Sequence, residues 1–214
     1  MYSLNEVETT AKRAAWGAGV PWGLAEDAGK AVRWLAAQGL SGPKALAQLL
    51  TGFDDKPYQL FSPQSDAGVW TASAGVLCPL VSGAAVSDMA ATLAAGRTID
   101  FGPCFVPILL LPFAAMAASL TDGPVSVAWD GAAFTATPDA LFLDASPDTL
   151  NAQSTRAVTW SAELQANRVF QPQARLRIAT EDWTALLGFG HRTFAPDTEA
   201  SRLAGAGAGE TDND

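Results

Sequence analysis

The amino-acid sequence predicts an α+β fold, in which an N-terminal helical lobe of three helices precedes a mixed body with a small, mainly antiparallel sheet. Residues 3–50 show the apolar spacing of three consecutive helices separated by short glycine-containing turns. Residues 125–134 alternate between large apolar and small or polar side chains around an Asp-Gly pair, as a β-hairpin does. A chain of 214 residues, 49% of them hydrophobic, can bury a substantial core.

The helical lobe is predicted in most detail. Ser3 stands three residues before Glu6, a capping box that starts the first helix. Gly17-Ala18-Gly19 ends this helix, and Pro21 suits the first turn of the next. The second helix has an apolar stripe with Gly29 beside it, and it ends at the pair Gly39-Leu40. Its stripe consists of Leu24, Ala28, Val32 and Leu35. A third, shorter helix starts at Ser41 and runs to Leu50.

The middle of the chain is predicted as a surface loop over residues 51–71, then a helical stretch over 76–96 in which Ser82 caps a helix. Residues 105–111 are interpreted as a buried strand or extended segment. Pro112 then opens a helix over 113–120. Periodicity does not separate strand from helix for such a short apolar run.

The last third contains further strand candidates at 141–143, 157–161 and 175–178. Thr180 is expected to cap a helix, and a short helical turn is expected over 197–203. One α+β domain is therefore predicted over residues 1–204, with the lobe at 1–50 and the body at 51–204. A Gly-rich acidic tail follows at 205–214.

Composition narrows the classes of partner. The net charge of −9 argues against nonspecific nucleic-acid binding, which needs a basic face. No positively charged start precedes an apolar run at the N-terminus, so no secretion signal is expected. The longest apolar stretch, residues 104–118, is too short for a membrane span. These features predict a soluble, cytoplasmic protein with no membrane partner.

Metal and cofactor sites are not predicted. Cys78 and Cys104 are far apart in apolar settings, so we expect two buried thiols rather than metal ligands. Gly17-Ala18-Gly19 follows a helix, whereas a dinucleotide-binding loop follows a strand. We therefore interpret it as a turn between helices.

His191, the one histidine, is the candidate catalytic residue because a lone histidine can act as an acid or a base. No serine or cysteine nucleophile stands in a recognisable setting beside it. Arg192 and Arg202 are near it in sequence, and both are candidate binding residues.

The second helix offers a further candidate site. Lys30 and Arg33 share a face with Glu26, beside Trp22. This face is either a solvated ladder of ion pairs or the cationic and aromatic wall of an anion-binding cleft. The chain has seven tryptophans, which is more than core filling usually requires. This number is the reason to retain the anion-binding cleft as an alternative.

Several stretches resemble an uncharacterised bacterial family, a domain of unknown function found largely in proteobacteria. They are SLNEVE at residues 3–8, AKRAAWGAG at 11–19, WGLAEDAGKAVRWL at 22–35 and TEASRLAGAGAG at 198–209, with DND at the end. The resemblance implies no established activity.

Residues 1–50 are also similar to the opening of the malate and L-lactate dehydrogenases that lack a Rossmann fold. The shared features are the Ser-x-x-Glu start, a Gly-x-Gly-Val run, an Ala-rich helix and a Gly-Leu-Ser-Gly turn. In that family a catalytic histidine follows the serine of the turn, whereas here Gly42 follows Ser41. The resemblance therefore implies a relative without that proton-transfer group, and the chain is too short for the usual cofactor domain.

Two functional hypotheses follow. The first is a non-catalytic binding or accessory protein of metabolism, with a small anionic metabolite as ligand and a homo-oligomer as a possible form. The second is an enzyme that acts on such a metabolite with His191, Arg192 and the Lys30/Arg33 face. Residues 180–214 carry seven acidic and two basic side chains, against four acidic and five basic over 1–50. We therefore expect residues 199–209 to dock on the chain or on a neighbouring copy.

Overall fold

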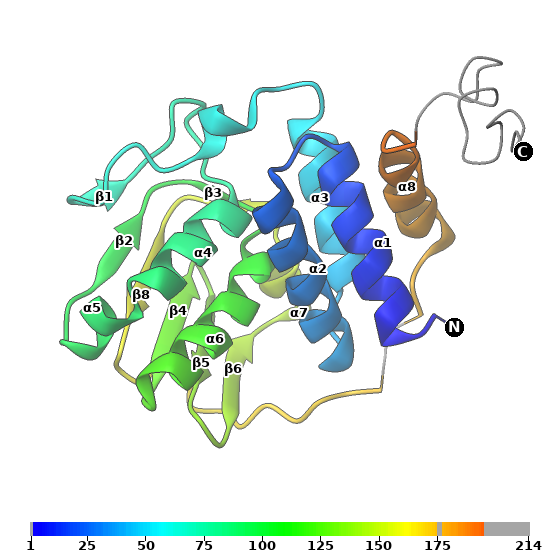
Figure 1. Cartoon of the computed structure of the whole chain (residues 1–214). Helices are drawn as coiled ribbons and strands as arrows, with labels where there is room; N and C mark the ends of the chain where they lie inside the picture. Colours follow the sequence, from blue (N-terminus) through cyan, green and yellow to red (C-terminus); the bar gives the residue numbers. More distant parts are fainter. Residues whose placement is uncertain (1, 175–176, 195–214) are drawn as a thin grey trace, which may run out of the picture.

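The computed structural model describes residues 2–174 and 177–194, and it confirms the α+β fold. A lobe formed by α1, α2, α3 and α8 lies beside a six-stranded sheet, and α6 packs on the sheet (Figure 1). Within these residues, no helix is both long and apolar enough to cross a membrane.

The three predicted N-terminal helices are confirmed. They are α1 (Leu4–Gly17), α2 (Trp22–Ala37) and α3 (Gly42–Phe53). The capping box is present, since Ser3 Oγ accepts from the Glu6 amide at 3.1 Å and Glu6 Oε2 accepts from the Ser3 amide at 2.6 Å. The Gly39 backbone has a φ of 76°, and the Leu40 amide donates to the Leu35 carbonyl oxygen at 2.8 Å. This is the helix-ending geometry that the Gly39-Leu40 pair predicts.

Helices α1 and α2 approach each other at backbone distance. A Cβ built on Gly29 of α2 would lie 2.9 Å from the Glu8 carbonyl oxygen and 3.0 Å from Lys12 Cβ, both on α1. Five alanines of these two helices are fully buried: Ala11, Ala14, Ala15, Ala25 and Ala28. Small residues therefore replace large apolar side chains at the contact between these helices.

The segment after α3 differs from the prediction in its details. Helix α3 continues to Phe53, three residues into the predicted loop, and a 3-10 turn, η1 (Tyr58–Phe61), follows. The helical stretch is confirmed as α4 (Pro79–Asp88) and α5 (Ala90–Ala94), which ends before Gly96. The prediction that Ser82 caps this helix was wrong, because α4 begins earlier, with Cys78 at the N-cap. Proline has no amide N–H, and the first turn of a helix does not need one. Pro79 therefore starts the helix one turn before Ser82.

The apolar run after residue 103 is mostly helical. The prediction of a strand over 105–111 was wrong, since only β3 (Cys104–Phe105) is extended. The run continues as η2 (Pro107–Leu110) and then as α6 (Leu111–Thr121), with Pro112 in its first turn as predicted. Val106 takes a left-handed conformation with a φ of 42° and turns the chain into η2. Burial on all sides removed the periodicity that would have identified the helix.

The larger sheet has the strand order β1-β2-β8-β4-β5-β6 and is antiparallel except between β1 and β2. Its strands are β1 (Val69–Trp70), β2 (Ile99–Phe101), β4 (Val125–Trp129), β5 (Ala132–Ala136), β6 (Leu141–Ala145) and β8 (Val158–Ser161). The predicted hairpin is β4 and β5, with Val127 opposite Phe134. A second sheet pairs β3 with β7 (Ser154–Thr155), and α7 (Pro147–Leu150) follows β6.

One face of the sheet belongs to the core. Val127, Phe134 and Trp160 stand next to one another in register on this face, and all three are buried. Trp34 of α2 meets the Phe134 ring edge-on, with 6.1 Å between the ring centroids. This contact joins the helical lobe to the sheet.

The C-terminal part of the chain brings α8 (Thr180–His191) back to the lobe, against α1 and α3. The prediction of a strand over 175–178 was wrong for residues 177 and 178, which are in no strand, and residues 175–176 lie outside the described part. The prediction that Thr180 caps the helix was also wrong, because the N-cap is Ala179 and no side chain caps this end. The predicted turn over 197–203 and the docking of residues 199–209 lie outside the described residues.

The close contact between α1 and α2 generates a stability prediction. Gly29→Leu should lower the free energy of unfolding by about 1–3 kcal/mol, because the new side chain collides with the backbone of α1. Gly23→Leu is the matched control on the same helix, since a Cβ there has no atom within 4 Å. That control should be neutral or stabilising by up to about 1 kcal/mol. Urea titration measures both, and equal stability of the two variants would contradict this packing.

Candidate functional site

A cavity of about 610 Å³ lies where the ends of four helices meet. We call it the helical cavity. It is walled by the start of α1, the end of α2, and the starts of α3 and α8. Its polar side chains are Ser41, Lys44, Arg177, Thr180 and Asp182, and its apolar side chains include Leu4, Val7, Leu40, Pro43 and Ile178. A cavity of this size with a few convergent polar groups is typical of small-molecule sites.

Two cationic side chains of this cavity stand out from the other basic residues. Six of the described lysines and arginines form ion pairs. Lys56 donates to the Gly52 carbonyl oxygen, and Arg13 lies over the Phe194 ring. Among the described lysines and arginines, only Lys44, Arg97 and Arg177 make no ion pair, side-chain hydrogen bond or ring contact. Two of these three line the helical cavity, which therefore holds free positive charge in a protein of net charge −9.

The cavity also receives two helix N-termini. Ser41, Pro43 and Lys44 begin α3, and Ala179 and Thr180 begin α8. No side chain caps either helix, so the first amides of both lack the usual side-chain acceptors. Free amides and the positive end of the helix dipole favour an anion.

Asp182 brings one negative charge to the same cavity. Partial burial raises the pKa of its carboxyl group, and neighbouring Glu181 raises it further, while Lys44 acts in the opposite direction. Lys44 and Asp182 therefore interact through space, but they form no direct ion pair. The cavity thus presents positive and negative groups that do not neutralise each other by contact.

Tyr2 lines the cavity and stacks on an aromatic ring of α8. The rings of Tyr2 and Trp183 are parallel to within 20°, with 3.9 Å between their centroids. Trp183 is buried on α8, so this stack attaches the start of the chain to that helix. The apolar side chains of the cavity continue from it along α1.

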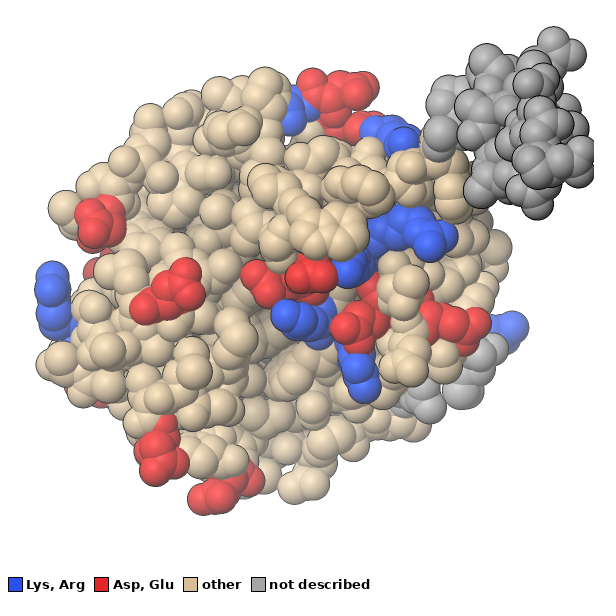
Figure 2. Space-filling view, in the orientation of Figure 1, with Lys and Arg blue, Asp and Glu red and all other residues tan. Residues whose placement is uncertain are grey.

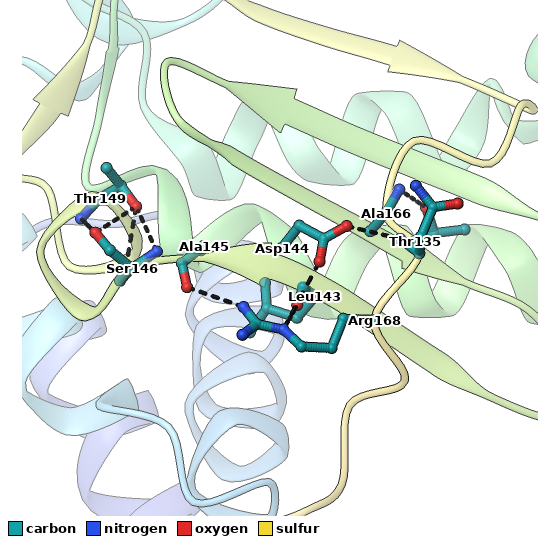
Figure 3. A network of polar contacts seen from close by, with 9 residues as sticks. Thr135, Leu143, Asp144, Ala145, Ser146, Thr149, Ala166 and Arg168 are labelled. Carbon is teal, nitrogen blue, oxygen red and sulfur yellow. Dashed lines mark hydrogen bonds and ion pairs between the residues drawn. The ribbon is translucent and has the colours of Figure 1, made fainter.

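A second cavity, of about 540 Å³, lies on the other side of the Leu40-Ser41 turn, next to the edge strand β6. Its one cationic residue, Arg168, is already engaged. The Arg168 guanidinium donates to the carbonyl oxygens of Leu143 and Ala145 and lies 3.7 Å from the Asp144 carboxylate (Figure 3). Since these bonds hold the 167–170 segment along β6, we assign this network a structural role.

His191 is exposed at the end of α8 and borders a separate cavity of about 100 Å³. Thr9, Thr10 and Arg13 of α1 form part of its lining. At about 30 Å³ per water molecule, this volume is small for a metabolite. The helical cavity lies at the opposite end of α8, roughly 17 Å away by the rise of a 12-residue helix.

Lys30 and Arg33 lie on the outer surface of α2, where Figure 2 shows basic and acidic side chains mixed over α1 and α2. Arg33 pairs with Glu8 at 2.7 Å, Lys12 pairs with Glu26 at 2.7 Å, and Lys30 lies 3.8 Å from Asp27. Trp22 is 51% exposed, and the Lys12 ammonium lies 4.3 Å from its ring centroid. The charges here form ion pairs, most of them between helices, and these residues line none of the three cavities described above.

Arg192 makes the best-formed ion pair of the described residues. Its two terminal nitrogens lie 2.6 and 2.9 Å from the carboxylate oxygens of Asp54. This bond lowers the pKa of Asp54 and joins the end of α8 to the end of α3. Arg202, the other predicted binding arginine, lies outside the described residues.

Both cysteines are buried, as predicted. Burial raises the pKa of the Cys78 thiol to about 11, and its sulfur lies 2.7 Å from the Tyr58 hydroxyl oxygen. The pKa of Cys104 is raised well above its usual value by burial. Both thiols are therefore protonated at neutral pH and are poor nucleophiles. Across the described residues, no three His, Cys, Asp or Glu side chains gather where they could hold a metal ion.

The predicted site residues thus lie in separate places, and none of those that the structure describes lines the helical cavity. Lys44 follows the Gly-Leu-Ser-Gly turn by two positions, and a lysine in the first turn of a helix is unusual because its charge opposes the helix dipole. That was the available signal for Lys44. Arg177 and Asp182 reach the cavity only through the return of the chain to α8.

Comparison with protein families matches residues 2–78 to the family described as "Protein of unknown function (DUF3726)". The match covers α1, α2 and α3 and ends at Cys78, just before α4. It confirms the resemblance of the N-terminal region to an uncharacterised family. No curated protein and no solved structure is significantly similar to the chain. The resemblance to the dehydrogenases stays a prediction.

The Arg192–Asp54 pair generates a prediction with a defined pH dependence. A double-mutant cycle with Arg192→Ala and Asp54→Ala should give a coupling of about 0.2–1 kcal/mol at neutral pH, the usual range for exposed pairs. The folded protein lowers the pKa of Asp54. The coupling should therefore be complete above the ordinary carboxyl pKa and disappear as the pH falls through the lowered value. Urea titrations in a pH series measure it, and a coupling that grows in acid would contradict the assignment.

Proposed function

We propose that this chain is a non-catalytic binding protein of metabolism, and that it holds a small anionic metabolite in the helical cavity. The observation that supports this best is the presence of Lys44 and Arg177, two of the three unengaged cations of the described residues, in one cavity. Lys44 and Arg177 are both exposed to solvent. A small anion bound in the cavity would supply the negative partner that both side chains lack.

The chemistry of the cavity favours a carboxylate or a similar small anion. The Arg177 guanidinium offers paired donors that match a carboxylate, and the Lys44 ammonium adds a compact charge. Amides at the starts of α3 and α8 add neutral donors. Hydrogen bonds to charged groups contribute about 1.5–3 kcal/mol each, so two or three of them support micromolar binding.

The alternative is an enzyme that acts on a small anionic metabolite, and the geometry supports it less. It requires His191, Arg192 and the Lys30/Arg33 face to meet at one ligand. Arg192 is engaged by Asp54 and Arg33 by Glu8, and His191 borders a cavity of about 100 Å³. The dehydrogenase histidine also has no space at position 42, since a Cβ on Gly42 would lie 2.7 Å from the Val32 carbonyl oxygen.

A thermal-shift screen against a library of small carboxylates and phosphates tests the proposal. A ligand that binds only the folded state adds about 2.7 kcal/mol of stability at a hundred times its dissociation constant. Lys44→Ala and Arg177→Ala should each weaken binding of the stabilising anion by about tenfold or more. Arg97→Ala is the matched control, because Arg97 is equally unengaged and does not line the cavity.

The proposal fails if no anion in the library stabilises the protein. It also fails if Arg97→Ala weakens the binding of the stabilising anion as much as the two cavity variants do, because the effect would then come from overall charge. His191→Ala tests the alternative that the protein is an enzyme. If that variant abolished a measured turnover while leaving the melting temperature unchanged, the enzyme would replace the binding protein.

A further inference from the structure

We propose that the ligand of the helical cavity is a zwitterion with an apolar side chain, of the class of the apolar α-amino acids, and that Asp182 recognises its ammonium group. This inference rests on the proposed function and narrows it. An anion alone would leave the Asp182 carboxylate facing a like charge. A ligand with both charges satisfies every charged side chain of the cavity.

The arrangement of the charges supports this class. Lys44 and Arg177 supply positive charge, and Asp182 supplies negative charge in the same cavity. Lys44 and Asp182 interact through space without a direct ion pair. Because the cationic and anionic side chains of the cavity do not pair with each other, a ligand that itself carries one negative and one positive group can pair with both. The carboxylate and ammonium of an α-amino acid are such a pair of separate charges, one for the two cations and one for Asp182.

The free-energy cost of placing the Asp182 carboxylate in the folded protein also favours a ligand with an ammonium group. Its carboxyl group is partly buried beside Glu181, and both features disfavour the charged form. Among the described residues it makes no ion pair or hydrogen bond that would offset this cost. A bound ammonium group would supply the missing partner. Residues that destabilise the free fold are characteristic of binding sites.

The apolar half of the cavity determines the kind of side chain. Leu4, Val7, Leu40 and Ile178 line it, and so does Tyr2, whose ring stacks on Trp183. These groups would bury an aliphatic or aromatic side chain at about 25 cal/mol per Å² of apolar surface. They offer no partner to a second charged group. The volume of about 610 Å³ leaves room for the largest apolar side chains.

Matched ligand pairs test the assignment by isothermal titration calorimetry. The probes are L-leucine with 4-methylpentanoate and L-phenylalanine with 3-phenylpropanoate, and each pair differs by the amino group alone. The full-length protein should bind the better amino acid about tenfold or more tightly than its deaminated partner, which is the usual value of a charge-assisted bond. Asp182→Asn should reduce this ratio to near one, while binding of the deaminated acid stays equal or improves.

Glu181→Gln is the matched control, because Glu181 is exposed on the same helical turn and does not line the cavity. It should preserve the preference for the amino acid. Melting temperatures of both variants verify folding, and Asp182→Asn should be at least as stable as the original protein at neutral pH. This follows because the raised pKa of Asp182 means that its charged form opposes folding.

The possible failures are distinguishable. Equal or tighter binding of the deaminated acids, or a preference that survives Asp182→Asn, overturns the zwitterion. Failure of both members of every pair to bind, while another small anion binds in a Lys44-dependent way, also overturns it and leaves the proposed function standing. If no anion binds through Lys44 and Arg177, the proposed function itself is wrong.

Discussion

The rest of the structure depends on the close approach of α1 to its neighbours. Gly29 of α2 lies against the α1 backbone on one side, and on the other side a Cβ on Gly17 of α1 would overlap the Phe189 carbonyl oxygen of α8. Alanines fill the contact with α2. Because α1 is held between α2 and α8 at backbone distance, little freedom remains in where α8 begins. The position of α8 in turn brings Asp182, and Arg177 just before the helix, to the same cavity as Lys44.

A cavity forms where this packing stops. Helices pack along their sides, but at their ends the chain turns away and leaves space lined by unpaired backbone groups. In this protein the starts of α3 and α8 and the end of α2 meet at one such place. The family match of residues 2–78 covers the wall formed by α1, α2 and α3, whereas the opposite wall comes from residues 177–182. Ligand recognition would therefore require both parts of the chain.

The distribution of charge separates structural from functional candidates. In an acidic protein most cations find a carboxylate, and those between α1 and α2 or between α8 and α3 hold elements together. These pairs are at least partly exposed, so each contributes little on its own. The cations that remain free in a cavity are the informative ones. The same reasoning applies to Asp182, which is charged, partly buried and without a direct partner.

Local sequence determined the three N-terminal helices, the β4–β5 hairpin and the burial of both cysteines, because capping boxes, glycine turns, alternation and apolar surroundings act over a few residues. It did not determine the fate of residues 105–111, whose complete burial removed any periodicity. Nor did it identify the site. The site depends on contacts between residues that are far apart in the chain. Arg33 and Arg192 pair with carboxylates on other helices, and Lys44 shares a cavity with Arg177 and Asp182. His191 borders a different cavity. Only the tertiary packing of α1, α3 and α8 decided which charges were neutralised and which remained free, because a charge's partner is set by distance in space, and sequence spacing does not encode that distance.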